Sequence, residues 1–319
     1  MAGTLRTAGI DIGTNSVRLL TGEFHHAAHG PSLQTLRRLM TITRLGEGVD
    51  EHGLLNPDAV ERTMATLRSY RGLMRTDEVE AWEVAATSAA RDASNASVFM
   101  QHVEEIMETP PRVLSGEEEA SLSFLGATYD LRGFRPQKGN LLVVDIGGGS
   151  TEVIVGGDGR ILEAFSIDVG CVRMSERFLA SDPPLPRELR EMEDHIRREL
   201  APRSGRVSRW EPVLMLGLAG TITTLSGLKQ GLERYDGDAI HHSWLNVSDV
   251  EALYKRLYSL PLVERREAMK LEPGRADVIV GGTAVLLVFL RELDIREFLV
   301  SEEDILDGLA ITAALKAAG

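Results

Sequence analysis

Two segments of this chain align on one another without a gap. They are IDIGTNSVRLLTG, at residues 10–22, and VDIGGGSTEVIVG, at residues 144–156. Each predicts a strand that ends in a carboxylate, a turn of glycine and small hydroxyl residues, and a returning strand. Asp11 thereby aligns with Asp145, and Ser16 aligns with Ser150. We therefore expect two copies of one hairpin, each at the start of a domain.

The glycines of these turns predict phosphate binding. Glycine lets the backbone approach an anion closely and direct its N–H groups toward it. Three consecutive glycines, as in the second turn, cost roughly 1 kcal/mol each in conformational freedom, and close approach of a phosphate gives a reason for them. A single such hairpin is common in any protein, whereas two copies favour a phosphate site. The predicted phosphate-binding residues are Gly13, Thr14, Asn15, Ser16, Gly147, Gly148, Gly149 and Ser150.

The two copies differ in charge at one aligned position, where Arg18 stands opposite Glu152. An arginine suits contact with phosphate oxygens, and a second carboxylate beside Asp145 suits Mg²⁺. The alternative is a pair of solvated strand residues. We predict that Asp145 and Glu152 hold Mg²⁺, that Mn²⁺ can replace it, and that Asp11 contacts the ion directly or through water.

A third glycine-containing element, LGLAGTITTLSG at residues 216–227, predicts a strand, a turn at Gly220 and a helix. Exposed N–H groups at a helix start bind anions readily. Alone, this pattern fits any strand-to-helix turn. Following two phosphate loops, it predicts that Gly220 and Thr221 form a third wall of the same site.

Composition limits the partners of this chain. A net charge of -13 argues against binding of a nucleic-acid polymer, although a cleft that is locally cationic can still bind a small polyanion. The single cysteine, Cys171, rules out an intrachain disulfide and a multi-thiolate metal site. Because no apolar run approaches the roughly 20 residues of a membrane helix, we expect a cytoplasmic protein without a membrane partner.

Strands and helices alternate along the chain, which predicts an α/β protein. We expect one domain over residues 1–125 and a second over 126–302, with loop composition at 131–139. Ser301 and Asp304 form a capping-box pattern that opens a final helix over about 303–319, which is free to return to the first domain. Further predicted helices cover 57–74, 94–108, 172–179 and 186–200, and further strands cover 79–86, 112–114, 164–169, 213–217 and 298–300.

Five segments, in this order and spacing, resemble the exopolyphosphatase and guanosine pentaphosphate phosphohydrolase (Ppx/GppA) family. They are DIGTNSVR, ATSAARDASN, SGEEEA, DIGGGSTE and GLAGTITTL. The resemblance runs from the first strand to the final helix. Sugar kinases and actin share related phosphate loops, but they are not expected to carry the second and third segments.

This resemblance implies two actin-like, ribonuclease-H-like domains flanking an interdomain cleft. It also implies a homodimer. Long members of the family append a C-terminal helical domain, and this chain resembles the short form. Arg173 and Arg275 match family positions near the cleft, and for both a functional and a structural role stay open.

The segment SGEEEA contains two neighbouring glutamates, Glu118 and Glu119, for which we expect different roles. Ser115 and Glu118 fit a capping box, which accounts for Glu118 without any catalysis. Capping does not explain Glu119, and its place on a helical wheel decides nothing. The resemblance implies that the glutamate directly before the alanine, Glu119, is the general base that activates water.

The segment ATSAARDASN places Arg91 at the end of a predicted strand, with Ser88 and Asn95 nearby. This composition suits contact with phosphate oxygens. The alternative is a helix entry that Asn95 caps. The chain departs from the family pattern after His242 and at the start of the last helix, where SEEDILDG lacks the arginine that is often found.

Together these patterns predict Mg²⁺-assisted hydrolysis of the terminal phosphoanhydride of inorganic polyphosphate. Arg18 and Arg91 would hold the phosphoryl group, and Glu119 would deprotonate the attacking water. Guanosine pentaphosphate is the alternative substrate. The alternatives from other classes are an ATP-dependent sugar or acetate kinase and an actin-like nucleotide-binding scaffold.

Overall fold

The computed structural model describes residues 4–25, 32–129, 131, 139–157 and 160–318. The chain divides into two compact units: Met1–Arg132 with Glu303–Gly319 form unit 1, and Gly133–Glu302 form unit 2. The boundary predicted after residue 125 is displaced, because helix α5 (Gly116–Tyr129) continues through it. The last residues belong to unit 1, where helix α13 (Ile305–Ala318) packs against α5.

Unit 1 is built on a mixed sheet with the strand order β3-β2-β1-β4-β5. Strands β1, β2 and β3 pair antiparallel, whereas β1, β4 and β5 run parallel. The strands are β1 (Thr4–Ile12), β2 (Ser16–His25), β3 (Ser32–Ile42), β4 (Ala81–Ala86) and β5 (Arg112–Val113). The other helices of this unit are α1 (Val49–His52), α2 (Pro57–Thr76), α3 (Ser88–Asp92) and α4 (Ala96–Met107).

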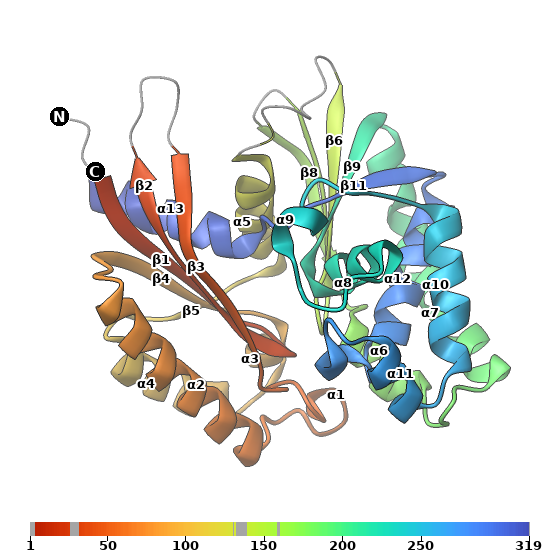
Figure 1. Cartoon of the computed structure of the whole chain (residues 1–319), viewed down its shortest axis with the longest axis horizontal. Helices are drawn as coiled ribbons and strands as arrows, with labels where there is room; N and C mark the ends of the chain where they lie inside the picture. The colour runs from red at the N-terminus through yellow and green to blue at the C-terminus, as the bar shows by residue number, and fades with distance from the viewer. Residues whose placement is uncertain (1–3, 26–31, 130, 132–138, 158–159, 319) are drawn as a thin grey trace. The chain divides into compact units, whose positions relative to one another are not determined.

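Helices cover both faces of the unit 1 sheet (Figure 1). Helices α2 and α4 bury apolar side chains such as Leu67 and Phe99 against one face. Helix α13 lies on the other face, where Thr7 Oγ1 donates to the carbonyl of Ala310 at 2.7 Å. Gly9 permits this contact, because a Cβ there would overlap the carbonyl oxygen of Leu306. The start of helix α13 is thus held close to strand β1.

Unit 2 contains a mixed sheet with the strand order β10-β11-β9-β6-β7-β8. The strands are β6 (Asn140–Ile146), β7 (Thr151–Gly157), β8 (Arg160–Ile167), β9 (Pro212–Leu218), β10 (Trp244–Asn246) and β11 (Glu297–Val300). The helices are α6 (Cys171–Phe178), α7 (Pro186–Ser208), α8 (Ala219–Gln230), α9 (Gly237–Ile240), α10 (Val247–Ser259), α11 (Leu262–Ala268), α12 (Ile279–Glu292) and the single turn η1 (Pro273–Arg275).

The two sheets share one topology. The order β3-β2-β1-β4-β5 in unit 1 corresponds to β8-β7-β6-β9-β11 in unit 2, where β10 adds an edge strand. In each unit the first three strands are antiparallel and the next two in the order join in parallel, while the edge strand β10 pairs antiparallel with β11. This repetition confirms the predicted α/β class with two actin-like units.

Most elements predicted from sequence are present within a few residues of their predicted bounds, whereas α7 runs to Ser208 instead of ending at 200, and three substantial elements were missed. These are β3, α10 and α12. Helix α12 is buried on all sides over Ile279–Leu290, so its sequence lacks the polar face that marks a surface helix. Strand β3 lies at the edge of its sheet and mixes arginine with leucine, which weakens its alternation.

The final helix begins differently from the prediction. Asp304 is its cap, because Asp304 Oδ1 accepts from the Leu306 N–H at 2.9 Å and the Asp304 N–H donates to Asp307 Oδ2 at 2.8 Å. The capping box therefore joins Asp304 and Asp307, one turn after the predicted pair of Ser301 and Asp304. The predicted loop at 131–139 falls almost wholly outside the described residues. Among the described helices, none combines the length and apolarity that crossing a membrane requires.

Candidate active site

The two predicted hairpins are present and share one turn geometry. Hairpin 1 consists of β1, β2 and their turn, and hairpin 2 consists of β6, β7 and their turn. The N–H of Gly13 donates to the carbonyl of Ser16 at 3.0 Å, and the N–H of Gly147 donates to the carbonyl of Ser150 at 3.0 Å. The internal alignment of the sequence is thus confirmed in the backbone.

The loop of hairpin 2 is bound from behind by the start of helix α6. The carbonyl of Gly147 accepts from the N–H of Cys171 at 2.9 Å, and the carbonyl of Gly148 accepts from the N–H of Val172 at 2.8 Å. Across a trans peptide bond, a carbonyl and the following N–H point in opposite directions. The N–H groups of Gly148 and Gly149 therefore point away from the helix, which suits contact with a phosphate oxygen.

The loop of hairpin 1 is also bound through its carbonyls, by the segment after β3, but one aligned position further along the chain. The carbonyl of Thr14 accepts from the N–H of Gly46 at 2.8 Å, and the carbonyl of Asn15 accepts from the N–H of Arg44 at 2.9 Å. By the same peptide geometry, the N–H groups of Asn15 and Ser16 point away from that segment. The side chain of Asn15 is buried, and its Nδ2 has no hydrogen-bond partner, so the loop holds an unused donor.

Hairpin 1 pairs Asp11 directly with Arg18. Nε and Nη2 of Arg18 both donate to Asp11 Oδ2, at 2.9 and 2.7 Å, and Nη1 of Arg18 bonds to Asp304. Burial raises the pKa of Asp11, although the charge of Arg18 opposes this effect. The other oxygen of Asp11, Oδ1, is buried without a hydrogen-bond partner. Arg18 thus has carboxylate partners where the sequence predicted phosphate.

Hairpin 2 pairs Asp145 directly with Glu152. Both side chains are buried, with residue exposures of 6% and 1%, and Ser166 of β8 donates to Glu152 Oε1 at 2.8 Å. Carboxylates that face one another across neighbouring strands repel, and a divalent cation relieves that repulsion. Mg²⁺ is commonly held by one or two carboxylates, with water and substrate phosphate as the other ligands. The chemistry of this pair therefore fits Mg²⁺.

The third predicted metal ligand, Asp11, belongs to unit 1, whereas Asp145 and Glu152 belong to unit 2. Within the described part of the chain, no group of three or more His, Cys, Asp or Glu side chains is arranged to hold a metal ion. The predicted trio is therefore a facing pair in unit 2 and a separate carboxylate in unit 1.

Helix α5 gives its neighbouring glutamates different surroundings. The N–H of Ser115 donates to Glu118 Oε2 at 2.9 Å, and the N–H of Glu118 donates to Ser115 Oγ at 3.2 Å, which confirms the predicted capping box. Glu119 is only 8% exposed, and its Oε2 lies 3.4 Å from Arg91 Nη1. Capping thus involves Glu118, while Glu119 is buried beside a cation.

The segment between β4 and α4 differs from its predicted form in two ways. Arg91 lies in the short helix α3 rather than at the strand end. Asn95 stands at the N-cap position of α4, as the alternative predicted, but its side chain makes no capping bond and does not contact the phosphate loops. Its amide exchanges hydrogen bonds of 2.8 and 3.1 Å with the backbone of Leu55. Ser88 does reach hairpin 1, since its Oγ lies 2.7 Å from Thr14 Oγ1.

The predicted third wall contains a buried arginine. Helix α8 begins at Ala219, and the guanidinium of Arg275 occupies the space beside Gly220, where a Cβ would overlap it. Arg275 is 8% exposed, so a buried cation lies at the start of α8. Arg173 follows the residues that bind hairpin 2, and its own N–H lies 3.2 Å from the carbonyl of Gly148. Both arginines are therefore next to predicted phosphate elements.

Sequence reasoning missed three residues that support the site. Ser166 holds Glu152, Asp304 holds Arg18, and Arg38 Nη2 lies 2.5 Å from Asp307 Oδ2. The one signal for this group is the acidic start of the last helix, which replaces the arginine often found in the family. Ser166 and Arg38 carry no distinguishing pattern, because their partners lie on other strands or on α13.

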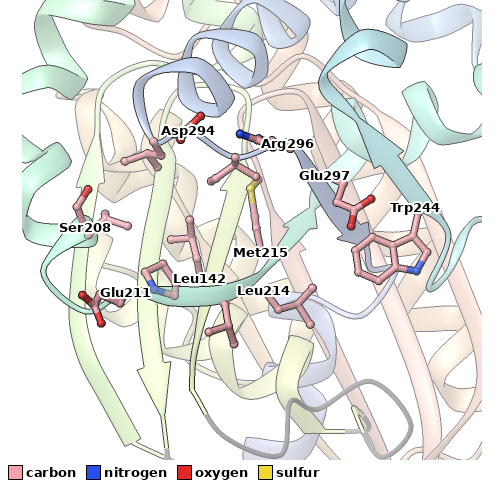
Figure 2. Close-up of a pocket in the computed structure, with 14 residues that line it drawn as sticks. Leu142, Ser208, Glu211, Leu214, Met215, Trp244, Asp294, Arg296 and Glu297 are labelled. Atoms are coloured by element: carbon pink, nitrogen blue, oxygen red, sulfur yellow. The ribbon is translucent and has the colours of Figure 1, made fainter.

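A separate cavity of about 410 Å³ lies in unit 2 (Figure 2). Figure 2 shows Trp244 and Glu297 at one end and Ser208 and Glu211 at the other. The cavity borders the beginning of β9, whereas the predicted phosphate elements follow the ends of β6 and β9. Its charged residues are three carboxylates and one guanidinium, which disfavours a polyanion. They are Glu211, Asp294, Glu297 and Arg296.

Comparison with known proteins identifies the family of this chain. Residues 24–317, which contain hairpin 2, Arg91 and Glu119, match the Ppx/GppA phosphatase family. The chain belongs to this family. As a Ppx/GppA phosphatase, it is an enzyme of the phosphoanhydride hydrolase class.

Relatives of this Ppx/GppA phosphatase match it over nearly the whole chain. Exopolyphosphatase 2 of Mycobacterium tuberculosis is 39% identical over 318 residues, which cover 97% of this chain and 98% of that protein. The crystal structure of an exopolyphosphatase-like protein is similar with a TM-score of 0.91 and 33% identity, covering 99% of both chains. A Ppx/GppA family member from Aquifex aeolicus has a TM-score of 0.81 and 30% identity, covering 99% of this chain and 100% of that one.

Proposed function

We propose that this Ppx/GppA phosphatase releases the terminal phosphate of inorganic polyphosphate by Mg²⁺-assisted attack of water. One observation carries the proposal: the two glycine turns match, and in each the loop carbonyls are bound from behind, so that loop N–H groups remain for phosphate oxygens. The identity to exopolyphosphatase 2 of Mycobacterium tuberculosis supports polyphosphate as the substrate.

In this proposal, unit 1 supplies the general base. Glu119 accepts a proton from the attacking water, and Arg91 orients Glu119 and balances charge on the phosphoryl oxygens. The N–H groups of hairpin 1 and the unused amide of Asn15 bind further phosphate oxygens. Asp11 Oδ1, which is buried without a hydrogen-bond partner, would bind the ion or a water of its hydration shell.

Unit 2 supplies the second phosphate loop and the carboxylates for the metal ion. Asp145 and Glu152 would hold Mg²⁺ or Mn²⁺, with Ser166 fixing the orientation of Glu152. When bound, the ion supplies charge compensation for the phosphate oxygens. Because phosphoryl transfer needs little covalent help from protein, positioning and charge compensation provide most of the acceleration.

Release of inorganic phosphate tests the substrate. The purified enzyme is given polyphosphates of several chain lengths, guanosine pentaphosphate and ATP, each with Mg²⁺, with Mn²⁺ and with a chelator. We expect metal-dependent release from polyphosphate, with slower release from the other two compounds. Faster release from guanosine pentaphosphate would show that this alternative, and not polyphosphate, is the preferred substrate. ATP with glycerol or acetate in a coupled assay tests the kinase alternative, and no release from any compound would refute the proposal.

Substitution of neighbouring glutamates tests the mechanism. Glu119→Gln keeps the size of the side chain but removes the base, so we expect kcat to fall by roughly 100-fold or more with little change in KM. Glu118→Gln is the matched control, because Glu118 contributes to the cap of the same helix and bonds to Arg112. We expect it to change thermal stability slightly and to leave kcat near the wild-type value. Equal kcat values for the two variants would remove Glu119 from the mechanism.

A homodimer remains a prediction from the family resemblance, and a cytoplasmic location remains a prediction from the apolar pattern of the sequence. Sedimentation of the purified protein at several concentrations tests the first, and fractionation of the source cells tests the second.

A further inference from the structure

We propose that Asp304, at the start of helix α13, is a positioning residue that orients Asp11 through Arg18. The inference deepens the proposed function and rests on it, because it concerns the carboxylate of hairpin 1 that would bind the ion or its water. It also gives Arg18 a role in place of the phosphate contact predicted from sequence.

The guanidinium of Arg18 joins the two carboxylates. Nε and Nη2 donate to the same oxygen of Asp11, Oδ2, while Nη1 bonds to Oδ2 of Asp304. Because the guanidinium is planar and rigid, fixing Nη1 on Asp304 also fixes the direction of the other two donors. With Oδ2 of Asp11 occupied by two donors, only Oδ1 is left to contact an ion or water.

The position of Asp304 is itself determined from several sides. Its Oδ1 caps helix α13 through the Leu306 N–H, and its own N–H is bonded to Asp307. Arg38 of strand β3 lies 3.6 Å from Asp304 Oδ1 and forms a shorter bond with Asp307. Gly126 of helix α5 lies against the carbonyl of Asp304 with no room for a Cβ. The carboxylate that holds Arg18 is therefore fixed by the packing of α13 on unit 1.

The ion pairs of Arg18 with Asp11 and Asp304 are buried, which strengthens their hold on the orientation of Asp11. Asp11 and Asp304 are each 4% exposed, so water does not readily replace a lost ion-pair partner. Burial alone would raise the pKa of Asp304, but Arg18 and Arg38 together hold that pKa below its usual value. Without the negative charge of Asp304, Arg18 loses the ion pair that holds Nη1, and the direction of its donors toward Asp11 is less constrained.

The test uses substitutions that keep the helix cap. Asn and Ser are both favoured N-caps, so Asp304→Asn and Asp304→Ser remove the charge while α13 still starts normally. Asp77→Asn is the matched control, because Asp77 accepts two bonds of 2.9 Å from Arg37 in the same unit but does not touch Arg18. Phosphate release, thermal unfolding and crystal structures are measured for all three variants.

We expect both Asp304 variants to lose about 10- to 100-fold in kcat with little change in KM, as small displacements of a site group can cause. In their crystal structures the guanidinium of Arg18 should turn from Asp11. Asp77→Asn should retain wild-type kcat, even if its thermal stability falls as much as that of the Asp304 variants. Equal kcat values for Asp304→Asn and Asp77→Asn, or an unmoved Arg18, would overturn the inference. If the wild type releases no phosphate, the proposed function fails, and the position of Arg18 in the crystal structures still decides this inference.

Discussion

Hairpin 1 and hairpin 2 share a backbone and differ in how they balance a buried carboxylate. In hairpin 1, Asp11 faces Arg18, so the negative charge is balanced within the protein. In hairpin 2, Asp145 faces Glu152, so the negative charge is doubled at the corresponding place. One aligned position thus separates a hairpin in which the carboxylate faces an arginine from one in which it faces a second carboxylate.

The comparison shows how a repeated motif can acquire two roles without changing its turn. The N–H to carbonyl bond of the turn measures 3.0 Å in both hairpins, and both loops are bound from behind through their carbonyls. Loop N–H groups that suit a phosphate oxygen are therefore common to the two copies. The proposed difference lies in the strand residue that follows, which anchors the carboxylate in one copy and binds metal in the other.

The largest expected effect is the loss of stability when hairpin 1 loses its cation. Arg18→Met leaves Asp11 and Asp304 buried without their shared partner, so we expect the free energy of unfolding to fall by about 3–5 kcal/mol. Urea denaturation monitored by circular dichroism measures this change. Arg18→Lys is the control, because it keeps the charge without the planar guanidinium. Its free energy of unfolding should lie between those of the wild type and Arg18→Met. A Met variant as stable as the wild type would show that hairpin 1 does not depend on internal charge balance.

The next effect, in hairpin 2, should fall on activity rather than on stability. Glu152→Gln removes one of two facing carboxylates, so in the absence of metal we expect the free energy of unfolding to stay the same or to rise. Loss of a metal ligand should lower kcat by about 100-fold or more. Phosphate release and urea denaturation in a chelator measure the two quantities on one protein sample.

Added metal sharpens the same contrast. A ligand that binds only the folded state at about 100 times its Kd stabilises a protein by about 2.7 kcal/mol. We expect Mg²⁺ to raise the Tm of the wild type relative to chelator, and to raise that of Glu152→Gln much less. An equal rise in both proteins would place the ion elsewhere and remove the proposed distinction between the hairpins.

The smallest effect concerns the glycines that support the two loops. A Cβ on Gly170 would overlap the backbone of Gly148, whereas a Cβ on Gly46 would overlap the methyl group of Thr14. Since a backbone yields less readily than a side chain, we expect Gly170→Ala to cost about 1–3 kcal/mol and Gly46→Ala to cost less. Thermal unfolding measures both. Thr14→Ser removes the methyl group and should relieve the Gly46→Ala variant but not the Gly170→Ala variant.

The turns were predictable because neighbouring residues encode them. Gly13 and Gly147 each begin the same four-residue turn, and glycine with Asp or Ser favours such a bend in any context. The cap of helix α5 was predictable for the same reason, since Ser115 and Glu118 lie within one turn. These contacts require no knowledge of where the rest of the chain lies.

The partners of the charged side chains were not predictable in this way. Arg18 and Asp304 are separated by 286 positions, and only the packing of helix α13 on strand β1 joins them. Asn95 was expected near phosphate or at a helix cap; it stands at the N-cap position of α4, but its amide pairs with Leu55, which is 40 positions away. Residue type indicated that these groups form polar contacts, but it did not indicate with which atoms.

The sequence by itself determined the two glycine hairpins, the α/β class and the aligned position where Arg18 replaces an acid. Local backbone preference and the spacing of side chains suffice for these features, because both act over a few residues. Only the tertiary structure decided that Arg18 binds Asp11 and Asp304, and that Glu119 is buried beside Arg91. The ion-pair partner of a charged side chain is the group that folding brings within a few ångström of it. That group depends on how helices and strands far apart in the chain pack together.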